Sequence, residues 1–246
     1  MLDLARSVFF NALFYANLTV YLILALPTLL LPRRAIIDMA KSWARTNLWL
    51  LRIIGGIEVE WRGLDRIPAG PLIVAAKHQS AWEAFALIPR FADPTFIVKR
   101  ELMWVPLFGW YMWKAGMIPV DRGARAQALT AMTARARAEL ARGRQIIIFP
   151  EGTRRAPGAA PAYKYGVVHL YAETGAACLP IALNSGLVWP RRSFCRHAGT
   201  VMVEILHPMP PGLGKQDFFD RLERCIETAT ARLVEEGQRS RVHKLA

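Results

Sequence analysis

The sequence predicts an α/β fold: a mixed, largely parallel sheet of about seven strands flanked by helices, preceded by an N-terminal membrane-embedded module of two helices. Three observations support this. After residue 56, short apolar segments alternate with helix-length segments, as in layered α/β proteins. Several short segments are apolar throughout, as strands buried on both faces are. The first 54 residues differ, because they include a long stretch without charge.

The composition points to an anionic partner, and to lipid in particular. Hydrophobic residues make up 53% of the chain, and 32 basic against 19 acidic residues give a net charge of +13. Such a charge suits nucleic acid, anionic lipid or a phosphorylated substrate, and the apolar excess favours lipid. The three cysteines, Cys178, Cys195 and Cys225, have no metal-like spacing. We therefore expect reduced thiols facing a cytosol, and no metal site.

Residues 8–31 form an uncharged stretch of 24 residues. About 20 helical residues cross a bilayer core, so this stretch is long enough to span. It is too long for a typical signal sequence, and Pro32, Arg33 and Arg34 follow it as they would follow an uncleaved anchor. If the helix spans, the two arginines place that end in the cytoplasm.

The next segment, residues 34–54, alternates apolar residues and tryptophans with basic residues, which is typical of a helix at a lipid interface. An alternative to a spanning helix is therefore a hairpin that dips into one leaflet and breaks near Pro27 and Pro32. Packing of both helices on a soluble core is the least favoured alternative. We divide the chain into membrane-anchoring helices, residues 1–54, and an α/β domain, residues 55–246.

The α/β domain shows seven candidate strands and five candidate helices. Strands are predicted at residues 57–62, 71–76, 95–99, 116–120, 145–150, 178–183 and 200–206. Helices are predicted at residues 82–90, 104–114, 123–142, 164–175 and 216–236. In sheets of this kind functional residues gather at strand ends, so the polar residues there are the candidate site.

His78 follows the strand 71–76, and Glu83 begins the next helix. The carboxylate could accept a hydrogen bond from the imidazole Nδ1–H and leave Nε2 free to take a proton from an attacking alcohol. The alternative is a histidine that caps a turn and an acid favoured by a helix N-terminus. Ser80 is a poor candidate nucleophile, because it lacks the Gly-x-Ser-x-Gly pattern.

A second candidate site is the segment FPEGTRR, residues 149–155, at the end of another strand. Gly152 permits a tight turn, and the Arg154 guanidinium suits a phosphate. Glu151 could hold a ligand hydroxyl or fix an arginine, and Lys164 could add a second cation.

Lys99 and Arg100 follow a third strand. Basic groups at several strand ends beside a histidine and an acid predict an anion site. The apolar strand 178–183, which contains Pro180, could line an acyl channel or belong to the core.

Four motifs in order carry a family resemblance: His78 with an acid five residues on, FIVKREL at residues 96–102, FPEGTR at 149–154 and LPIALNSG at 179–186. Together they resemble the glycerolipid acyltransferases, and among them the bacterial 1-acylglycerol-3-phosphate acyltransferases. The resemblance implies a glycerolphosphate acyltransferase-like fold. It makes His78 the base that deprotonates the sn-2 hydroxyl. It also implies three sets of binding residues: Lys99 and Arg100 for the acceptor; Glu151, Gly152, Thr153 and Arg154 for the head group; and Pro180 for the acyl or acceptor channel.

The implied reaction transfers a fatty acyl group from acyl-CoA or acyl carrier protein to 1-acylglycerol-3-phosphate, which yields phosphatidic acid. No metal and no bound cofactor are expected, and the location is the bacterial inner membrane with the catalytic domain on its cytoplasmic face. The sequence departs from the family at Glu83, where an aspartate is usual. This departure leaves open another lysolipid acceptor, such as lyso-ornithine lipid.

Other function classes explain fewer of these features. A hydrolase could use the same histidine and acid with water, but it does not need a phosphate-suited loop. A non-catalytic basic membrane-binding protein explains the charge but not the histidine among basic residues at strand ends. The arginine-rich helix at residues 122–144 is the best support for nucleic-acid binding. It suits anionic lipid head groups or an acidic carrier protein better, at about 1 kcal/mol per basic residue near a charged membrane. We therefore expect no nucleic-acid partner.

Overall fold

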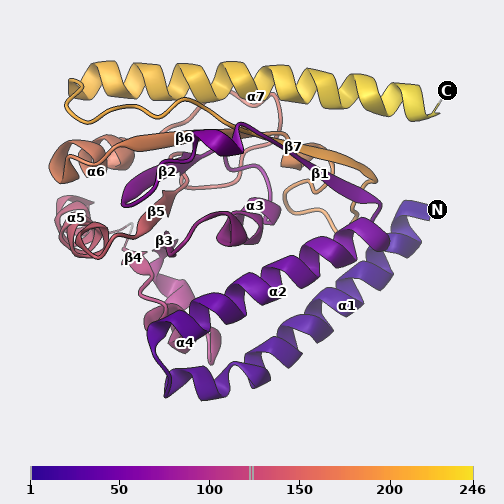
Figure 1. The fold of residues 1–246 in the computed structure, drawn as a ribbon. Helices are drawn as coiled ribbons and strands as arrows, with labels where there is room; N and C mark the ends of the chain where they lie inside the picture. The colour runs from indigo at the N-terminus through magenta and orange to yellow at the C-terminus, as the bar shows by residue number, and fades with distance from the viewer. Residues whose placement is uncertain (1, 122, 124, 246) are drawn as a thin grey trace.

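A computed structural model describes residues 2–121, 123 and 125–245 of the chain. Its strands form one central sheet that helices surround, and the long C-terminal helix crosses one face of that sheet (Figure 1). Residues 122 and 124, at the start of the predicted arginine-rich helix, lie outside the described residues, as do both terminal residues.

The sheet has seven strands in the described chain, as predicted. They are β1 (Ile57–Arg62), β2 (Leu72–Ala76), β3 (Pro94–Lys99), β4 (Ile118–Val120), β5 (Gln145–Ile148), β6 (Cys178–Leu183) and β7 (Gly199–Ile205). Their order across the sheet is β1-β7-β6-β2-β5-β3-β4. Every neighbouring pair is parallel except β6 and β7, so the prediction of a mixed, largely parallel sheet is confirmed.

Seven α-helices accompany the described strands. They are α1 (Leu2–Leu24), α2 (Arg33–Ile53), α3 (Trp82–Ala86), α4 (Phe108–Lys114), α5 (Arg125–Ala141), α6 (Gly166–Thr174) and α7 (Lys215–Leu245). The predicted helix 82–90 is shorter because Pro89 cannot continue it, and a 3-10 turn, Ile88–Arg90, follows. Pro106 likewise separates a 3-10 turn, Arg100–Trp104, from α4. The last helix runs nine residues beyond its predicted end at residue 236.

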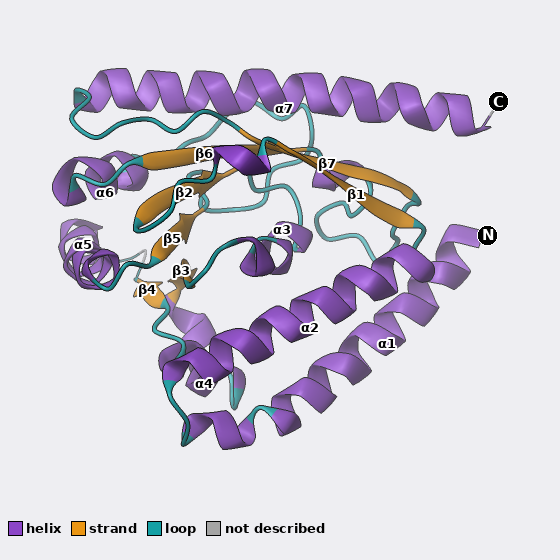
Figure 2. Ribbon diagram, viewed as in Figure 1, coloured by secondary structure: helices purple, strands orange, loops and turns teal. Residues whose placement is uncertain are grey.

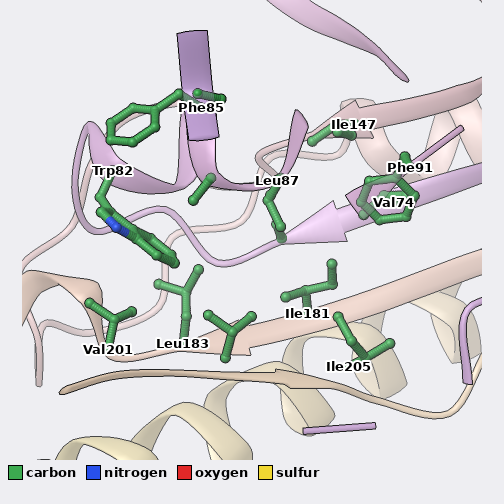
Figure 3. Packing of buried hydrophobic residues seen from close by; sticks show 14 of the residues in the cluster. Val74, Trp82, Phe85, Leu87, Phe91, Ile147, Ile181, Leu183, Val201 and Ile205 are labelled. Carbon is green, nitrogen blue, oxygen red and sulfur yellow. The ribbon is translucent and has the colours of Figure 1, made fainter. Parts of the chain in front are cut away.

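The helices cover both faces of the sheet (Figure 2). On one face, Val74, Ile147 and Ile181 pack with Trp82 and Phe85 of α3 (Figure 3). The alternate strand residues pack on the other face, against α5, α6 and α7. Burial on both faces explains why β2 and β6 are apolar along their length and why β5 is apolar after Gln145.

The two N-terminal helices form a hairpin. The chain leaves α1 through a 3-10 turn, Leu26–Leu29, that contains Pro27, and Pro32 immediately precedes α2. The break therefore lies where the two prolines predicted it. Within the described residues, Asp3–Leu24 is one helix that is long and apolar enough to cross a membrane. The predicted boundary after residue 54 falls between α2 and β1.

Both ends of α1 are attached to the α/β layers. Near its start, the Ser7 hydroxyl oxygen accepts a hydrogen bond of 2.7 Å from the Arg196 backbone N–H, in the segment between β6 and β7. Near its end, the Tyr111 hydroxyl of α4 donates to the carbonyl oxygen of Leu22 over 2.6 Å. The hairpin thus lies along the domain instead of extending away from it.

Candidate active site

The order of the strands brings the predicted site residues to one edge of the sheet. Strands β6, β2, β5 and β3 are consecutive neighbours and mutually parallel, so their carboxyl ends lie side by side. His78 follows β2, the FPEGTR segment follows β5, and Lys99 ends β3. Segments that are far apart in the sequence thereby meet at this edge, as in other sheets of this type.

His78 and Glu83 form the contact that their spacing predicted. The imidazole Nδ1 lies 2.9 Å from Glu83 Oε1. The same oxygen accepts the backbone N–H groups of Gln79 at 2.6 Å and Ser80 at 2.7 Å. Glu83 is fully buried, and these backbone donors fix its carboxylate in the tight turn between β2 and α3. A carboxylate held by backbone donors is well suited to orient an imidazole.

The imidazole ring is also fixed from the side. It stacks on the Phe149 ring with 4.1 Å between centroids and 16° between planes. Because a carboxylate accepts hydrogen bonds, Nδ1 carries the proton in the neutral ring and Nε2 carries the lone pair. The His78 side chain retains 16% exposure. It is therefore an oriented proton acceptor that a ligand can reach.

Ser80 plays a different part in the same turn. Its hydroxyl oxygen accepts the backbone N–H of Trp82 over 3.2 Å, at the start of α3. Serine commonly satisfies free N–H groups at helix starts in this way. Ser80 is fully buried, so the structure gives it a supporting role in the turn.

Glu151 also supports the turn. It was expected to contact a ligand hydroxyl or an arginine, and in the structure it contacts Lys77 and the backbone of His78 instead. Its Oε1 lies 2.9 Å from Lys77 Nζ, and its Oε2 accepts the backbone N–H of His78 at 2.9 Å. Lys77 Nζ also donates to Glu227 of α7 over 2.6 Å, and the Tyr163 hydroxyl donates to the same carboxylate. Burial raises the pKa of the Glu151 carboxyl, although the hydrogen bond from Lys77 opposes this. Glu151 is 1% exposed, so it holds the backbone of His78 in place.

The segment after β5 turns tightly at Gly152, as predicted. Gly152 has a φ of +63°, and an added Cβ would meet the Lys164 side chain at 3.2 Å. The Arg155 backbone N–H donates to the carbonyl oxygen of His78 over 2.8 Å. The glycine turn thus lets the loop pass close to both the Lys164 chain and the histidine.

The predicted cations lie around this turn and reach solvent. Thr153 and Arg154 are exposed, and Arg154 has no ion-pair partner in the part of the chain that the structure describes. Lys99 and Arg100 are also exposed, and each pairs with a nearby carboxylate, at 3.0 and 2.8 Å. Exposed pairs contribute little stability, so a phosphate can compete with them.

Pro180 lies away from His78. It sits within β6 in register with Ala75, whose side chain packs against α5, α6 and α7. His78 stacks on Phe149, which packs with the core on the α3 face. Pro180 is therefore a buried residue on the opposite face of the sheet from His78, and its place in an acyl or acceptor channel stays a prediction.

Two site contacts escaped the sequence analysis. The Ser185 hydroxyl donates to Glu83 Oε2 over 2.7 Å, and the Gly186 N–H donates to Gln79 Oε1 over 3.0 Å. Both donors follow β6 within the LPIALNSG motif, but nothing in that motif shows which residue it contacts 102 positions away. The parallel pairing of β6 with β2 creates this proximity.

The cysteines form neither a disulfide nor a metal site within the described residues. The three cysteines are free thiols. Burial raises the pKa of Cys225 to about 11, so its thiol is protonated at neutral pH. Within the described residues, no group of three or more histidine, cysteine, aspartate or glutamate side chains is placed to hold a metal ion.

The chain is similar in sequence to acyltransferases of known name. The chain is 37% identical over 167 residues to the 1-acyl-sn-glycerol-3-phosphate acyltransferase of Pseudomonas aeruginosa, a match that covers 68% of this chain and 65% of that protein. It is 27% identical to the lyso-ornithine lipid O-acyltransferase of the same organism, over 75% of this chain and 77% of that one.

The fold has a solved counterpart. It matches the crystal structure of PlsC, the 1-acyl-sn-glycerophosphate acyltransferase from Thermotoga maritima, with a TM-score of 0.77 and 21% identity. That match covers 93% of this chain and 97% of the other. The family model described as Acyltransferase matches residues 58–184. This range extends from β1 to the end of β6 and includes His78 and the FPEGTR segment. The chain therefore belongs to the acyltransferase family.

Proposed function

We propose that this protein transfers a fatty acyl group from an acyl thioester to the sn-2 hydroxyl of 1-acylglycerol-3-phosphate and so makes phosphatidic acid. The observation that carries the proposal is the oriented pair of His78 and buried Glu83, 2.9 Å apart, at a sheet edge surrounded by exposed cations. The name of the Pseudomonas aeruginosa relative supports this choice of acceptor.

In the proposed reaction His78 acts as a general base. Its Nε2 takes the proton of the acceptor hydroxyl while the oxygen attacks the thioester carbonyl. A C–O bond forms, the C–S bond breaks, and the imidazolium returns the proton to the departing thiolate. Glu83 stabilises the imidazolium that exists between these two proton transfers.

The exposed cations select an acceptor with a phosphate. Arg154 offers a guanidinium without an ion-pair partner among the described residues, and a guanidinium binds phosphate through paired hydrogen bonds. Lys164, Lys99 and Arg100 add positive charge around the same edge. The phosphate would hold the hydroxyl near His78, and such positioning accounts for much of the rate in bimolecular reactions. A hydrolase uses water as the acceptor, so it does not need a phosphate contact to hold its nucleophile near His78.

The protein is proposed to bind the cytoplasmic face of the bacterial inner membrane. Because both ends of α1 are attached to the α/β layers, a hairpin whose tip dips into one leaflet fits better than a free spanning helix. The tip exposes Leu30 at 94%, and neighbouring α4 exposes Trp110 at 56% and Trp113 at 75%. Tryptophan is characteristic of the membrane interface, so we propose that α4 enters the lipid beside the tip.

The acyl donor would be soluble, on coenzyme A or on acyl carrier protein. A thioester is already an activated acyl group, and His78 supplies the proton transfer. We therefore expect the reaction to need neither a metal nor a bound cofactor. Purified protein that is treated with a chelator and desalted should retain its full rate.

A second candidate acceptor is lyso-ornithine lipid, because the chain is 27% identical to an acyltransferase of that name. An amino-acid head group has no phosphate, so this acceptor would not depend on Arg154 in the same way.

An acceptor panel distinguishes these candidates. Purified protein is supplied with 1-acylglycerol-3-phosphate and lyso-ornithine lipid together, with acyl-CoA or acyl carrier protein as donor, and the products are identified by mass spectrometry. We expect phosphatidic acid to dominate. Predominant ornithine lipid would replace the proposed acceptor, and free fatty acid as the main product would indicate a hydrolase.

A further inference from the structure

We propose that Ser185 is a positioning residue for the catalytic pair, which acts by holding the second oxygen of Glu83. The inference rests on the proposed function of His78 as a base. It also gives the LPIALNSG motif a role at the site that does not involve Pro180.

The hydrogen bonds to Glu83 divide unequally between its two oxygens. Oε1 meets His78 Nδ1 and two backbone N–H groups, those of Gln79 and Ser80. Among the described residues, the donor to Oε2 is the Ser185 hydroxyl, at 2.7 Å. The Ser185 hydroxyl thus holds the second oxygen, and together with the backbone donors on Oε1 it fixes the rotation of the carboxylate about its last bond.

Ser185 is itself held rigidly. It is fully buried, in the short turn Ser185–Leu187 that follows β6. The preceding residue, Asn184, accepts the Met202 N–H at 2.8 Å and donates to the carbonyl oxygen of Leu233 in α7 at 3.0 Å. The turn is therefore connected to β7 and to α7, and the backbone that carries the Ser185 side chain is held in place.

The next residue leaves no free space in the turn. A Cβ added to Gly186 would lie 2.8 Å from Pro157 and 3.1 Å from the Cβ of Gln79. The Gly186 N–H also donates to the Gln79 side chain. The turn after β6 thus packs directly on the turn that carries His78, and Ser185 makes the polar contact between them.

The hydroxyl has an electrostatic effect as well as a geometric one. A hydrogen bond donated to a carboxylate disperses its charge and makes it a weaker base. Without the Ser185 donor, both the charge distribution of Glu83 and the direction of its Oε1 change, so the interaction of Glu83 with the His78 imidazolium changes as well. The other charged groups near this turn are Lys77, Glu151, Glu227 of α7, and Arg154, Arg155 and Lys164 in the segment after β5. They are unchanged when only Ser185 is replaced.

The test compares the pH dependence of kcat/KM in Ser185→Ala and Ser185→Thr with that of the native protein, on whichever acceptor the native protein acylates. We expect Ser185→Ala to lose roughly tenfold in kcat, the lower end of what one hydrogen bond to a charged group contributes. We also expect an unchanged acceptor KM and a displaced acidic limb, that is, a shift of the low-pH side of the profile. Threonine retains the hydroxyl and should restore both kcat and the limb.

Ser193→Ala is the matched control, because it removes a serine hydroxyl that, among the described residues, bonds only to the backbone of Cys195. Its profile should follow that of the native protein, and all variants should show cooperative thermal unfolding. A Ser185→Ala profile that superimposes on the native one, or a loss of kcat with the limb unmoved, would overturn the inference. If the native protein acylates no lysolipid, the proposed function fails. The histidine titration followed by NMR in native and Ser185→Ala protein, with the His78 signal assigned by its loss in His78→Gln, still decides the role of Ser185.

Discussion

Replacing Glu83 with glutamine removes the charge of the catalytic pair while leaving its hydrogen bonds nearly intact. The amide oxygen can occupy the place of Oε1 and accept from His78, Gln79 and Ser80. The amide nitrogen can occupy the place of Oε2 and donate to the Ser185 hydroxyl oxygen. We therefore expect the Glu83→Gln protein to fold with a free energy of unfolding within about 1 kcal/mol of native.

The cost to catalysis follows from the distance between the two side chains. Nδ1 and Oε1 are 2.9 Å apart, which puts the charge centres of an imidazolium and a carboxylate about 4 Å apart. Two unit charges at that separation attract by about 4 kcal/mol at an effective dielectric constant of 20. Since about 1.36 kcal/mol corresponds to a factor of ten, kcat should fall about 1,000-fold.

The assay is the initial rate of acyl transfer at saturating acceptor, with folding checked by circular dichroism. Glu83→Asp keeps the charge but shortens the side chain by about 1.5 Å, one C–C bond. It should retain at least about ten times the kcat of Glu83→Gln if charge outweighs reach. A Glu83→Gln protein within tenfold of native kcat would refute the idea that an imidazolium is stabilised by this carboxylate.

Arg154→Ala should raise the KM for 1-acylglycerol-3-phosphate about tenfold or more with kcat little changed, because it removes a phosphate contact made before the transition state. A double variant in which serine replaces both Trp110 and Trp113 should bind anionic lipid vesicles at least about tenfold more weakly in a sedimentation assay. The reason is that burying each large side chain contributes up to about 3 kcal/mol. Asp93→Asn should lower the free energy of unfolding at pH 7 by about 1 to 2 kcal/mol, measured by urea titration. Burial raises the pKa of Asp93, but its hydrogen bonds with Arg33 and Arg144 outweigh this and lower it below 3.8. The ionised form therefore stabilises the fold above pH 3.8, and the difference between the two proteins should shrink as the pH falls below that value.

Matched variants separate these effects from general damage. Arg142→Ala removes an exposed arginine directly after α5 and should leave the acceptor KM unchanged. Phe194→Ser removes an exposed aromatic residue outside α4 and the hairpin tip, so vesicle binding should persist. An unchanged KM in Arg154→Ala would remove that residue from the phosphate site. Unchanged vesicle binding without the two tryptophans would exclude α4 from the membrane surface, and an Asp93→Asn difference that is constant from pH 7 to pH 3 would contradict the ion-pair explanation.

The fold was predictable because its signals are local. Runs such as Leu72–Ala76 are apolar at every position, which indicates burial on both faces, and prolines at positions 27 and 32 mark the turn of the hairpin. The pairing of His78 with Glu83 was also predictable, since a strand end and a helix start five residues apart can face each other across a tight turn.

Contacts between distant segments were not predictable from local patterns. The ion pair of Lys77 with Glu151 depends on β2 lying beside β5, and the bond of Ser185 to Glu83 depends on β6 lying on the other side. Residue types alone suggested that Glu151 holds a ligand hydroxyl or fixes an arginine. Its burial under the His78 turn became evident only once the order of the strands was known.

The rate of phosphatidic acid formation by the native protein and by His78→Ala, measured side by side with 1-acylglycerol-3-phosphate and an acyl thioester, tests most directly whether His78 is the base. A general base contributes about 100- to 10,000-fold, so the variant should be folded and at least about 100-fold slower. A folded His78→Ala protein that forms phosphatidic acid at the native rate would contradict the proposed mechanism.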